Sequence, residues 1–330
     1  MSRRLVDTLG RVVTNLRISV TDRCNFRCSY CMPEEGMEWL KRNQLLTYEE
    51  ITRLARIFAS LSIYKIRLTG GEPLMRKELW QLVAMLKKID GIRDIALTTN
   101  GYFLAEQAQR LADSGLDRIN ISLDSLDPLL FADLTRRDYF RRTWEGIEAA
   151  EKAGIHPIKL NVVLVRGVND GEILNFAELA RKRPYVIRFI EFMPIGKDDG
   201  WVLDKVVSTR EILQTINSYR PLVPLPHVNG KAPADRYMFA DGKGEIGFIS
   251  SVSQPFCGDC DRVRVTSDGK FRTCLFSLTE TDLRAMLRGG TSDEEIAEAL
   301  VNAVSKKEEG HLINRPEFIR PERTMSQIGG

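Results

Sequence analysis

Strand and helix patterns alternate along the first two thirds of this chain, and this alternation restricts the fold more than any other feature. Short apolar segments typical of strands lie at about 16–20, 64–69, 94–99, 118–123, 157–164 and 185–191. Amphipathic segments typical of helices lie between them, at about 48–61, 76–88, 104–114, 143–153 and 171–182. Because each connection can hold a helical crossover, we predict an α/β fold whose parallel strands wind right-handedly into a partial or complete barrel.

The pattern changes after a further helical segment at about 208–217. The stretch 220–236 is rich in proline and typical of a linker, and short strands with glycine turns follow it. Two more helical segments are predicted at about 279–288 and 292–305. We therefore expect two domains, residues 1–217 and a smaller domain at residues 218–330.

Charge balance and hydropathy exclude several classes of protein. The chain has 330 residues, with 48 Lys and Arg against 45 Asp and Glu, and its formal net charge of +3 is too small for a protein that coats DNA or RNA. The start of the chain has no apolar stretch of the signal-peptide kind, and no apolar run is long enough to span a bilayer. We therefore expect a cytoplasmic protein with neither a nucleic-acid nor a membrane partner.

The side chains of each predicted strand divide into an apolar face and a polar face, since neighbouring residues on a strand point to opposite sides. The polar faces carry cations and hydrogen-bonding groups, namely Arg17, Arg67, Thr98, Asn120, Ser122, Lys159 and Arg188. An ordinary barrel fills its interior with branched apolar side chains. If the two faces of a strand are assigned the wrong way round, its charged side chain faces solvent instead. The agreement among five strands favours a cationic interior that holds an anionic ligand.

The six cysteines form two groups of three. Cys24, Cys28 and Cys31 directly follow the first strand, and thiols this close together cannot all pair as disulfides. Three thiolates on one loop suit a soft metal centre, and an iron–sulfur cluster accepts ligation by thiolates alone. A cubane cluster normally takes four cysteines, so three ligands leave one iron open to a small molecule.

The second group, Cys257, Cys260 and Cys274, repeats this arrangement near the C-terminus. A structural zinc ion is the alternative here, because a CxxC hairpin resembles half of a zinc ribbon. Zinc needs a fourth ligand, however, and no cysteine remains to supply it. His227 and His311 lie far from this group in the sequence.

The motif Cys24-x-x-x-Cys28-x-x-Cys31, with Gly70-Gly71-Glu72-Pro73 at the end of the second strand, resembles the radical S-adenosylmethionine (SAM) superfamily. LTTNG at 97–101, NISLDS at 120–125, EFMPIG at 191–196 and the C-terminal CxxC-x13-C resemble the molybdenum-cofactor biosynthesis protein A family, the GTP 3',8-cyclases. The resemblance covers essentially the whole chain. It implies a partial (β/α)6 TIM-like barrel with a smaller C-terminal iron–sulfur domain.

The resemblance also implies cofactors and their contacts. The first cysteine group is expected to hold a [4Fe-4S] cluster that binds SAM, and the second group a further [4Fe-4S] cluster that binds the guanine ring of GTP. The other family contacts to SAM correspond to Tyr30, Gly71, Ser122 and Met193. The family contacts to GTP correspond to Arg17, Arg67, Thr98, Lys159, Arg262, Val263 and Arg264. No side chain is expected to act as the catalyst, because cluster and SAM generate the radical.

In this family a 5'-deoxyadenosyl radical removes the ribose 3' hydrogen of GTP to give 3',8-cyclo-7,8-dihydro-GTP, in the first step of molybdenum cofactor (molybdopterin) biosynthesis. The expected partners are a flavodoxin- or ferredoxin-type reductant, cyclic pyranopterin monophosphate synthase as acceptor of the product, and a second copy of the chain. Two rival functions are a peptide-modifying radical SAM enzyme, which usually has more C-terminal cysteines, and an electron-transfer protein, which usually caps every iron.

The sequence ends in Gly329 and Gly330. Two glycines maximise the entropy lost when a terminus becomes ordered, so their presence needs a reason. A backbone without side chains can enter a narrow cavity, and a cationic interior would attract a terminal carboxylate. The family resemblance points the same way. We expect the tail to insert into the barrel and to arrange the arginines around SAM and GTP; a frayed terminus is the alternative.

Overall fold

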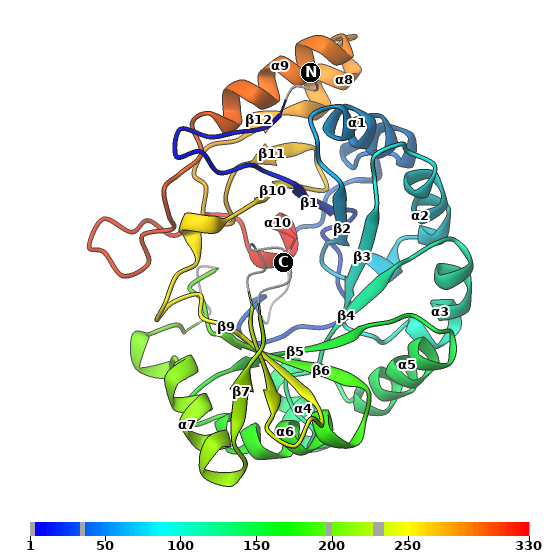
Figure 1. Cartoon of the computed structure of the whole chain (residues 1–330). Helices are drawn as coiled ribbons and strands as arrows, with labels where there is room; N and C mark the ends of the chain where they lie inside the picture. The colour runs from blue at the N-terminus through cyan, green and yellow to red at the C-terminus, as the bar shows by residue number, and fades with distance from the viewer. Residues whose placement is uncertain (1–3, 34–36, 196–199, 227–233, 330) are drawn as a thin grey trace.

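Twelve strands form one continuous sheet in the computed structural model of the chain, which describes residues 4–33, 37–195, 200–226 and 234–329. The strand order is β12-β11-β10-β1-β2-β3-β4-β5-β6-β9-β8-β7. The six strands expected from the sequence are β1 (Asn15–Ser19), β2 (Lys65–Thr69), β3 (Asp94–Thr99), β4 (Arg118–Ser122), β5 (Ile158–Leu164) and β6 (Tyr185–Glu191). They pair in parallel in chain order and curve into an open barrel (Figure 1). The predicted partial (β/α)6 barrel is therefore confirmed.

Helices cover the outer face of this barrel (Figure 1). They are α1 (Tyr48–Ser60), α2 (Leu79–Lys87), α3 (Leu104–Asp113), α4 (Pro128–Thr135), α5 (Phe140–Lys152), α6 (Ile173–Lys182) and α7 (Thr209–Tyr219). Helix α1 begins at a capping box, in which Thr47 accepts a hydrogen bond from the Glu50 N–H and the Glu50 side chain accepts one from the Thr47 N–H. Short 3-10 turns lie at Arg42–Gln44, Pro73–Met75, Asp170–Glu172, Leu203–Lys205 and Cys257–Asp259.

The apolar core lies between the helices and the outer face of the strands. Ile18 of β1, Ile66 of β2 and Ile121 of β4 are fully buried there, as are Leu54 and Phe58 of α1. Their neighbours on the strands point the other way, toward the axis of the barrel, because side chains alternate along a strand. The sequence-based assignment of the two strand faces is therefore confirmed, and it places the polar side chains inside.

The residues after 218 add strands at both ends of the same sheet. Strands β7 (Leu222–Pro224), β8 (Asp235–Phe239) and β9 (Glu245–Ile249) continue it beyond β6, and β10 (Arg262–Val265), β11 (Lys270–Arg272) and β12 (Thr281–Asp282) continue it beyond β1. Both β9 and β10 pair in parallel with the barrel strands. The last helices are α8 (Leu283–Arg288), α9 (Asp293–Val304) and α10 (Met325–Ile328). The domain boundary near 218 stays a prediction, since the sheet runs across it.

The structure differs from the sequence-based elements in three places. Helix α4 was not expected; Pro128 at its first position and the Asp127 cap start it, but its eight residues are largely apolar all round and show little helical periodicity. The predicted linker at 220–236 is wrong in part, because β7 pairs there with β8, while 227–233 lie outside the described residues. Helix α8 begins later than predicted, because residues 281–282 pair with β11.

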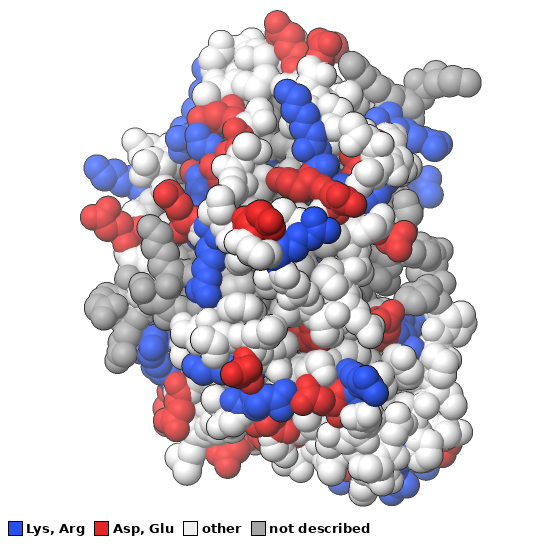
Figure 2. Space-filling view, turned by 90° about the vertical axis from the view of Figure 1, so that its left-hand side faces the viewer, with Lys and Arg blue, Asp and Glu red and all other residues white. Residues whose placement is uncertain are grey.

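The surface carries charges of both signs. Figure 2 shows Lys and Arg interspersed with Asp and Glu over the face it presents, in agreement with the small net charge. Many of these charges are paired, as Arg181 is with Asp241 (2.7 Å) and Arg53 with Asp293 (2.7 Å). In the part of the chain that the structure describes, no helix is both long and apolar enough to cross a membrane.

Candidate active site

A cavity of about 300 Å³ lies inside the barrel, where the carboxyl ends of the strands meet the C-terminal segments. All six cysteines line this one cavity, although the two groups are more than two hundred residues apart in the sequence. The other predicted site residues in its wall are Arg17, Tyr30, Arg67, Gly71, Thr98, Ser122, Met193, Arg262 and Arg264. Two predicted residues do not line it: Lys159 lies lower on β5, and the side chain of Val263 is buried in the apolar core.

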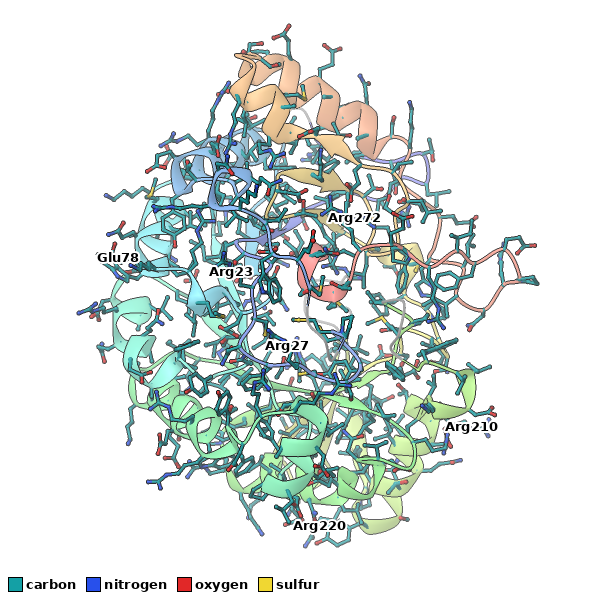
Figure 3. All side chains as sticks on the ribbon, turned by 180° about the vertical axis from the view of Figure 1, so that it is seen from behind. Arg23, Arg27, Glu78, Arg210, Arg220 and Arg272 are labelled. Atoms are coloured by element: carbon teal, nitrogen blue, oxygen red, sulfur yellow. The ribbon has the colours of Figure 1, made fainter. Side chains whose placement is uncertain are left out.

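The first cysteine group lies on the loop that follows β1. The Arg27 guanidinium donates to the carbonyl oxygens of Cys24 and Phe26, both at 2.7 Å, and so fixes the loop. Figure 3 shows Arg27 and Arg23 on this loop at the mouth of the barrel, near α10, whereas Glu78, Arg210 and Arg220 lie on the periphery. All three thiols are free. Burial raises the pKa of Cys24 to about 12, so its thiolate needs a bound cation to form.

Gly71 lets the end of β2 approach the cysteine loop. A Cβ atom at this position would lie 2.4 Å from the Arg23 carbonyl oxygen and 2.6 Å from that of Asp22, so only glycine fits. The next residue, Glu72, is fully buried and accepts hydrogen bonds from Thr99 Oγ1 (2.7 Å) and from the Asn100 N–H (2.7 Å). Gly71 at the end of β2 therefore packs against the cysteine loop, and Glu72 connects this point to the end of β3 through its hydrogen bonds.

Tyr30 is held by a residue that the sequence analysis did not single out. Its hydroxyl donates a hydrogen bond to the carboxylate of Asp124, which also accepts one from the Val163 N–H at 2.8 Å. Burial raises the pKa of Asp124 to about 6. Asp124 belongs to the NISLDS segment and follows β4 by two residues. Its position just after the end of a strand is the sequence feature that could have identified it as a site residue.

A row of three arginines crosses the cavity wall. Parallel pairing places Arg17 of β1 opposite Arg264 of β10 on one side and opposite Arg67 of β2 on the other. Burial, with the neighbouring charge of Arg262, lowers the pKa of Arg17 to about 9, and burial likewise lowers the pKa of Arg67 and of Arg264. Among the described residues, none of the three forms an ion pair with a carboxylate, and the buried Nε of Arg17 has no hydrogen-bond partner.

Further cations lie beyond this row. Arg188 of β6 lines the cavity beside Asn161, whose buried Oδ1 has no partner among the described residues. Lys159 lies one layer below, and burial together with the charges of Arg188, Arg118 and Arg67 lowers its pKa to about 7. Several unpaired cations in one buried space are stabilised only when an anion enters. The interior therefore fits a polyanionic ligand.

The second cysteine group lines the same cavity as the first. The Arg262 guanidinium lies 3.4 Å from Cys260 Sγ. Burial alone would raise the pKa of Cys260, but the charges of Arg262 and Lys307 bring it down to about 7. In the described part of the chain, no three His, Cys, Asp or Glu side chains are gathered as a single metal ion requires.

The C-terminal tail enters the same cavity. Helix α10 lies at the centre of the barrel (Figure 1), and Met325 and Ser326 line the cavity wall. The carbonyl oxygen of Gly329 accepts a hydrogen bond from Arg264. A Cβ atom at Gly329 would lie 2.5 Å from Thr69 Oγ1. The predicted insertion of the tail is therefore confirmed as far as Gly329, and Gly330 lies outside the described residues.

Comparisons with known proteins agree with this site. Residues 18–180 match the model of the radical SAM superfamily, and residues 185–313 match that of Molybdenum Cofactor Synthesis C. A GTP 3',8-cyclase of Streptomyces coelicolor is 46% identical over 328 residues, which are 99% of this chain and 96% of that protein. The chain belongs to the GTP 3',8-cyclase family. Another member, from Syntrophomonas wolfei, is 45% identical over 99% of this chain and all of its own length.

Membership of this radical SAM family implies a [4Fe-4S] cluster and SAM, and Cys24, Cys28 and Cys31 are the residues that would hold the cluster. The free thiols on the loop, the open cavity beside them and the close approach of Gly71 fit such a group. A solved structure, SuiB of Streptococcus suis with bound S-adenosylmethionine, shares the fold with a TM-score of 0.62 at 14% identity, over 94% of this chain and 77% of that one.

Proposed function

We propose that this protein is a radical SAM GTP 3',8-cyclase, which converts GTP into 3',8-cyclo-7,8-dihydro-GTP in the first step of molybdenum cofactor biosynthesis. One observation carries the proposal: the row Arg264, Arg17 and Arg67, which has no carboxylate partner among the described residues, lies in the cavity that both cysteine groups share. A triphosphate is the kind of anion that such a row stabilises. The near full-length identity to named GTP 3',8-cyclases supports it.

The second cysteine group is proposed to hold a second [4Fe-4S] cluster. Three thiols with one open coordination position suit a cluster that binds a ligand directly. Cys260 beside Arg262 is already poised to be a thiolate near neutral pH. The open iron would face the same cavity as the row of arginines, and this arrangement lets one GTP molecule place its base on the cluster and its phosphates on the cations.

The protein's own residues bind, orient and enclose the reactants. When bound, the first cluster and SAM would supply a 5'-deoxyadenosyl radical able to remove the ribose 3' hydrogen. Tyr30, Gly71, Ser122 and Met193 line the cavity and are proposed to contact SAM. Arg17, Arg67, Thr98, Arg262 and Arg264 line it too and are proposed to contact GTP. The inserted tail reduces the space left for water, which protects a radical from side reactions.

Lys159 and Val263 have weaker support as GTP contacts. Lys159 lies outside the cavity wall but adds positive charge beneath Arg188, so we propose that it acts on the triphosphate through the field of the cation cluster. The Val263 side chain packs in the apolar core, which leaves only its backbone for a contact. The reductant, the acceptor of the product, a homodimer and a cytoplasmic location remain predictions from the sequence.

Anaerobic reconstitution with iron and sulfide, followed by product analysis with GTP, tests this function. We expect SAM cleavage together with 3',8-cyclo-7,8-dihydro-GTP, and neither in a Cys24→Ser variant. SAM cleavage without that product would favour a radical enzyme that acts on another substrate. A protein that takes up two clusters but never cleaves SAM would be an electron carrier, contrary to the proposal.

A further inference from the structure

Lys307 is a buried lysine beside the second cysteine group. Its side chain is 5% exposed, and its ammonium donates to the carbonyl oxygen of Arg262 at 3.0 Å and to that of Thr273. Arg262 follows Cys260 by two residues, and Thr273 directly precedes Cys274. One ammonium group therefore connects the two separate segments that carry the three cysteines.

The charge of Lys307 has no carboxylate partner in the part of the chain that the structure describes. The neighbouring Glu308 carboxylate accepts instead from Thr273 Oγ1 at 2.6 Å. Arg11 gives a useful contrast, since it binds the carbonyl oxygen of Cys257 at 2.7 Å but is itself paired with the buried Asp7 at 2.5 Å. A buried ammonium that lacks a counter-ion is strongly disfavoured.

The three thiols are the groups that can supply the missing negative charge. The two carbonyl groups that Lys307 binds lie two residues after Cys260 and one residue before Cys274. The Lys307 ammonium is therefore placed beside both cysteine segments of the proposed second cluster, where its charge acts on their thiolates.

We propose that Lys307 is a positioning residue of the second cluster: its ammonium holds the two cysteine segments at the spacing of a cubane and compensates the negative charge of the cluster thiolates. This proposal rests on the proposed function, because it requires the second cluster. The positive charge also stabilises the reduced cluster, which carries one more electron than the oxidised form. Lys307 thereby raises the reduction potential of the site that binds the guanine ring.

The segment around Lys307 supports this role. Arg11 binds the carbonyl oxygens of Glu308 and Glu309, and Gly310 lies against Cys257, since a Cβ atom at Gly310 would meet Cys257 Cβ at 3.5 Å. The segment 307–310 is thus fixed against the second cysteine group at several points, so the Lys307 ammonium has little freedom to move away. Removing its charge should change the cluster without freeing the segment.

The experiment compares Lys307→Met, Lys307→Arg and Lys306→Met in full-length protein. All are made in a background with Cys24, Cys28 and Cys31 replaced by Ser, so that only the second cluster gives a signal. Lys306 is the adjacent exposed lysine and serves as the matched control. The readouts are iron and sulfide content after anaerobic reconstitution, and the midpoint potential of the cluster from a redox titration followed by electron paramagnetic resonance.

We expect Lys307→Met to shift the midpoint potential to a more negative value, or to lose the cluster, while Lys307→Arg and Lys306→Met behave like the parent. Equal potentials in all four proteins would overturn the proposal. Loss of the cluster in both Lys307 variants would also overturn it. Lys307→Arg keeps the positive charge, so the shape of the side chain, and not its charge, would then hold the cluster. A parent without any cluster would instead contradict the second cluster of the proposed function, and the role of Lys307 would fall with it.

Discussion

The guanidinium of Arg264 donates a hydrogen bond to the carbonyl oxygen of Gly329, inside the barrel. Arg264 lies opposite Arg17 in the register of β10 and β1, so the end of the chain touches the row of arginines that is proposed to bind the triphosphate. On the proposed function, the tail and the substrate share this cation. This relationship makes the placement of the tail part of the geometry of the site.

Gly329→Ala should disturb that placement. The residue has φ 84° and a Cβ atom would meet Thr69 Oγ1 at 2.5 Å, so the inserted conformation becomes unfavourable by about 1–3 kcal/mol. We expect product formation from GTP to fall about tenfold or more, with iron content unchanged. Gly171→Ala is the matched control, since a Cβ atom there meets nothing within 4 Å. Wild-type turnover in Gly329→Ala would show that the tail has no role in catalysis.

The two cysteine groups should assemble their clusters separately. We predict about eight irons and eight sulfides per chain after anaerobic reconstitution. Cys24→Ser should lose about half of the iron and all SAM cleavage, whereas Cys274→Ser should lose the other half and keep some SAM cleavage. Iron, sulfide and zinc analysis of protein purified without air measures this. Stoichiometric zinc with a single cluster would contradict the assignment.

The interior cations should bind the phosphates of GTP. Arg17→Ala should weaken GTP binding by roughly 1.5–3 kcal/mol, the range for a charged hydrogen bond. Lys159→Ala should weaken it by less, since Lys159 acts only through its field, and Lys152→Ala on the exposed surface of α5 should have little effect. Guanosine should bind the unaltered protein much more weakly than GTP. Calorimetric titration of both ligands tests this, and equal affinities would rule out a role for the cations.

Lys159 also predicts a pH dependence. Its pKa is lowered to about 7, below its ordinary value of 10.5, so the penalty for burying its charge is present in full below pH 7 and is lost as the pH rises from 7 to 10.5. The free energy of unfolding of the ligand-free protein should therefore rise as the pH increases over that range. GTP binding should take up a proton and weaken over the same range. In Lys159→Met the proton uptake, measured by calorimetry in buffers of different ionisation enthalpy, should be smaller.

The buried pair Asp7 and Arg11 should stabilise the fold near Cys257. Arg11→Met leaves the fully buried Asp7 carboxylate without its partner, which should destabilise the protein by about 3–5 kcal/mol. Adding Asp7→Asn should restore part of the loss, since the uncompensated charge is removed. Urea unfolding of the single and double variants measures this. Strictly additive effects would mean that the two side chains do not interact.

Much of the barrel could be read from local patterns. The period-two alternation on the strands correctly predicted that Arg17, Arg67 and Arg188 point inward, because strand geometry alone decides the face of a side chain. Many residues lining the cavity also followed, since motifs such as Cys24 to Cys31 lie at strand ends, but Lys159 and Val263 do not line it. Helix α4 was missed because a short helix that is apolar on all sides has no periodic signal.

Pairing between distant segments could not be read in the same way. The neighbours of Arg17 include Arg264, and no local pattern records that β10 joins β1. Lys307 lies in the segment SKKEEG, whose charges are typical of a solvated surface, yet it is almost fully buried while Lys306 is exposed. Burial depends on which surfaces meet in the folded chain, and this is set by contacts far apart in sequence.

The amino-acid sequence by itself determined the strand and helix alternation, the inward face of the cations and the two groups of three cysteines, since these follow from spacing and chemistry along the chain. Tertiary structure alone decided that both cysteine groups open into one cavity, that Gly329 reaches Arg264 and that Lys307 lies beside the second group. The physical reason is that electrostatic and packing energies depend on distance through space, which becomes defined only when the sheet closes around its interior.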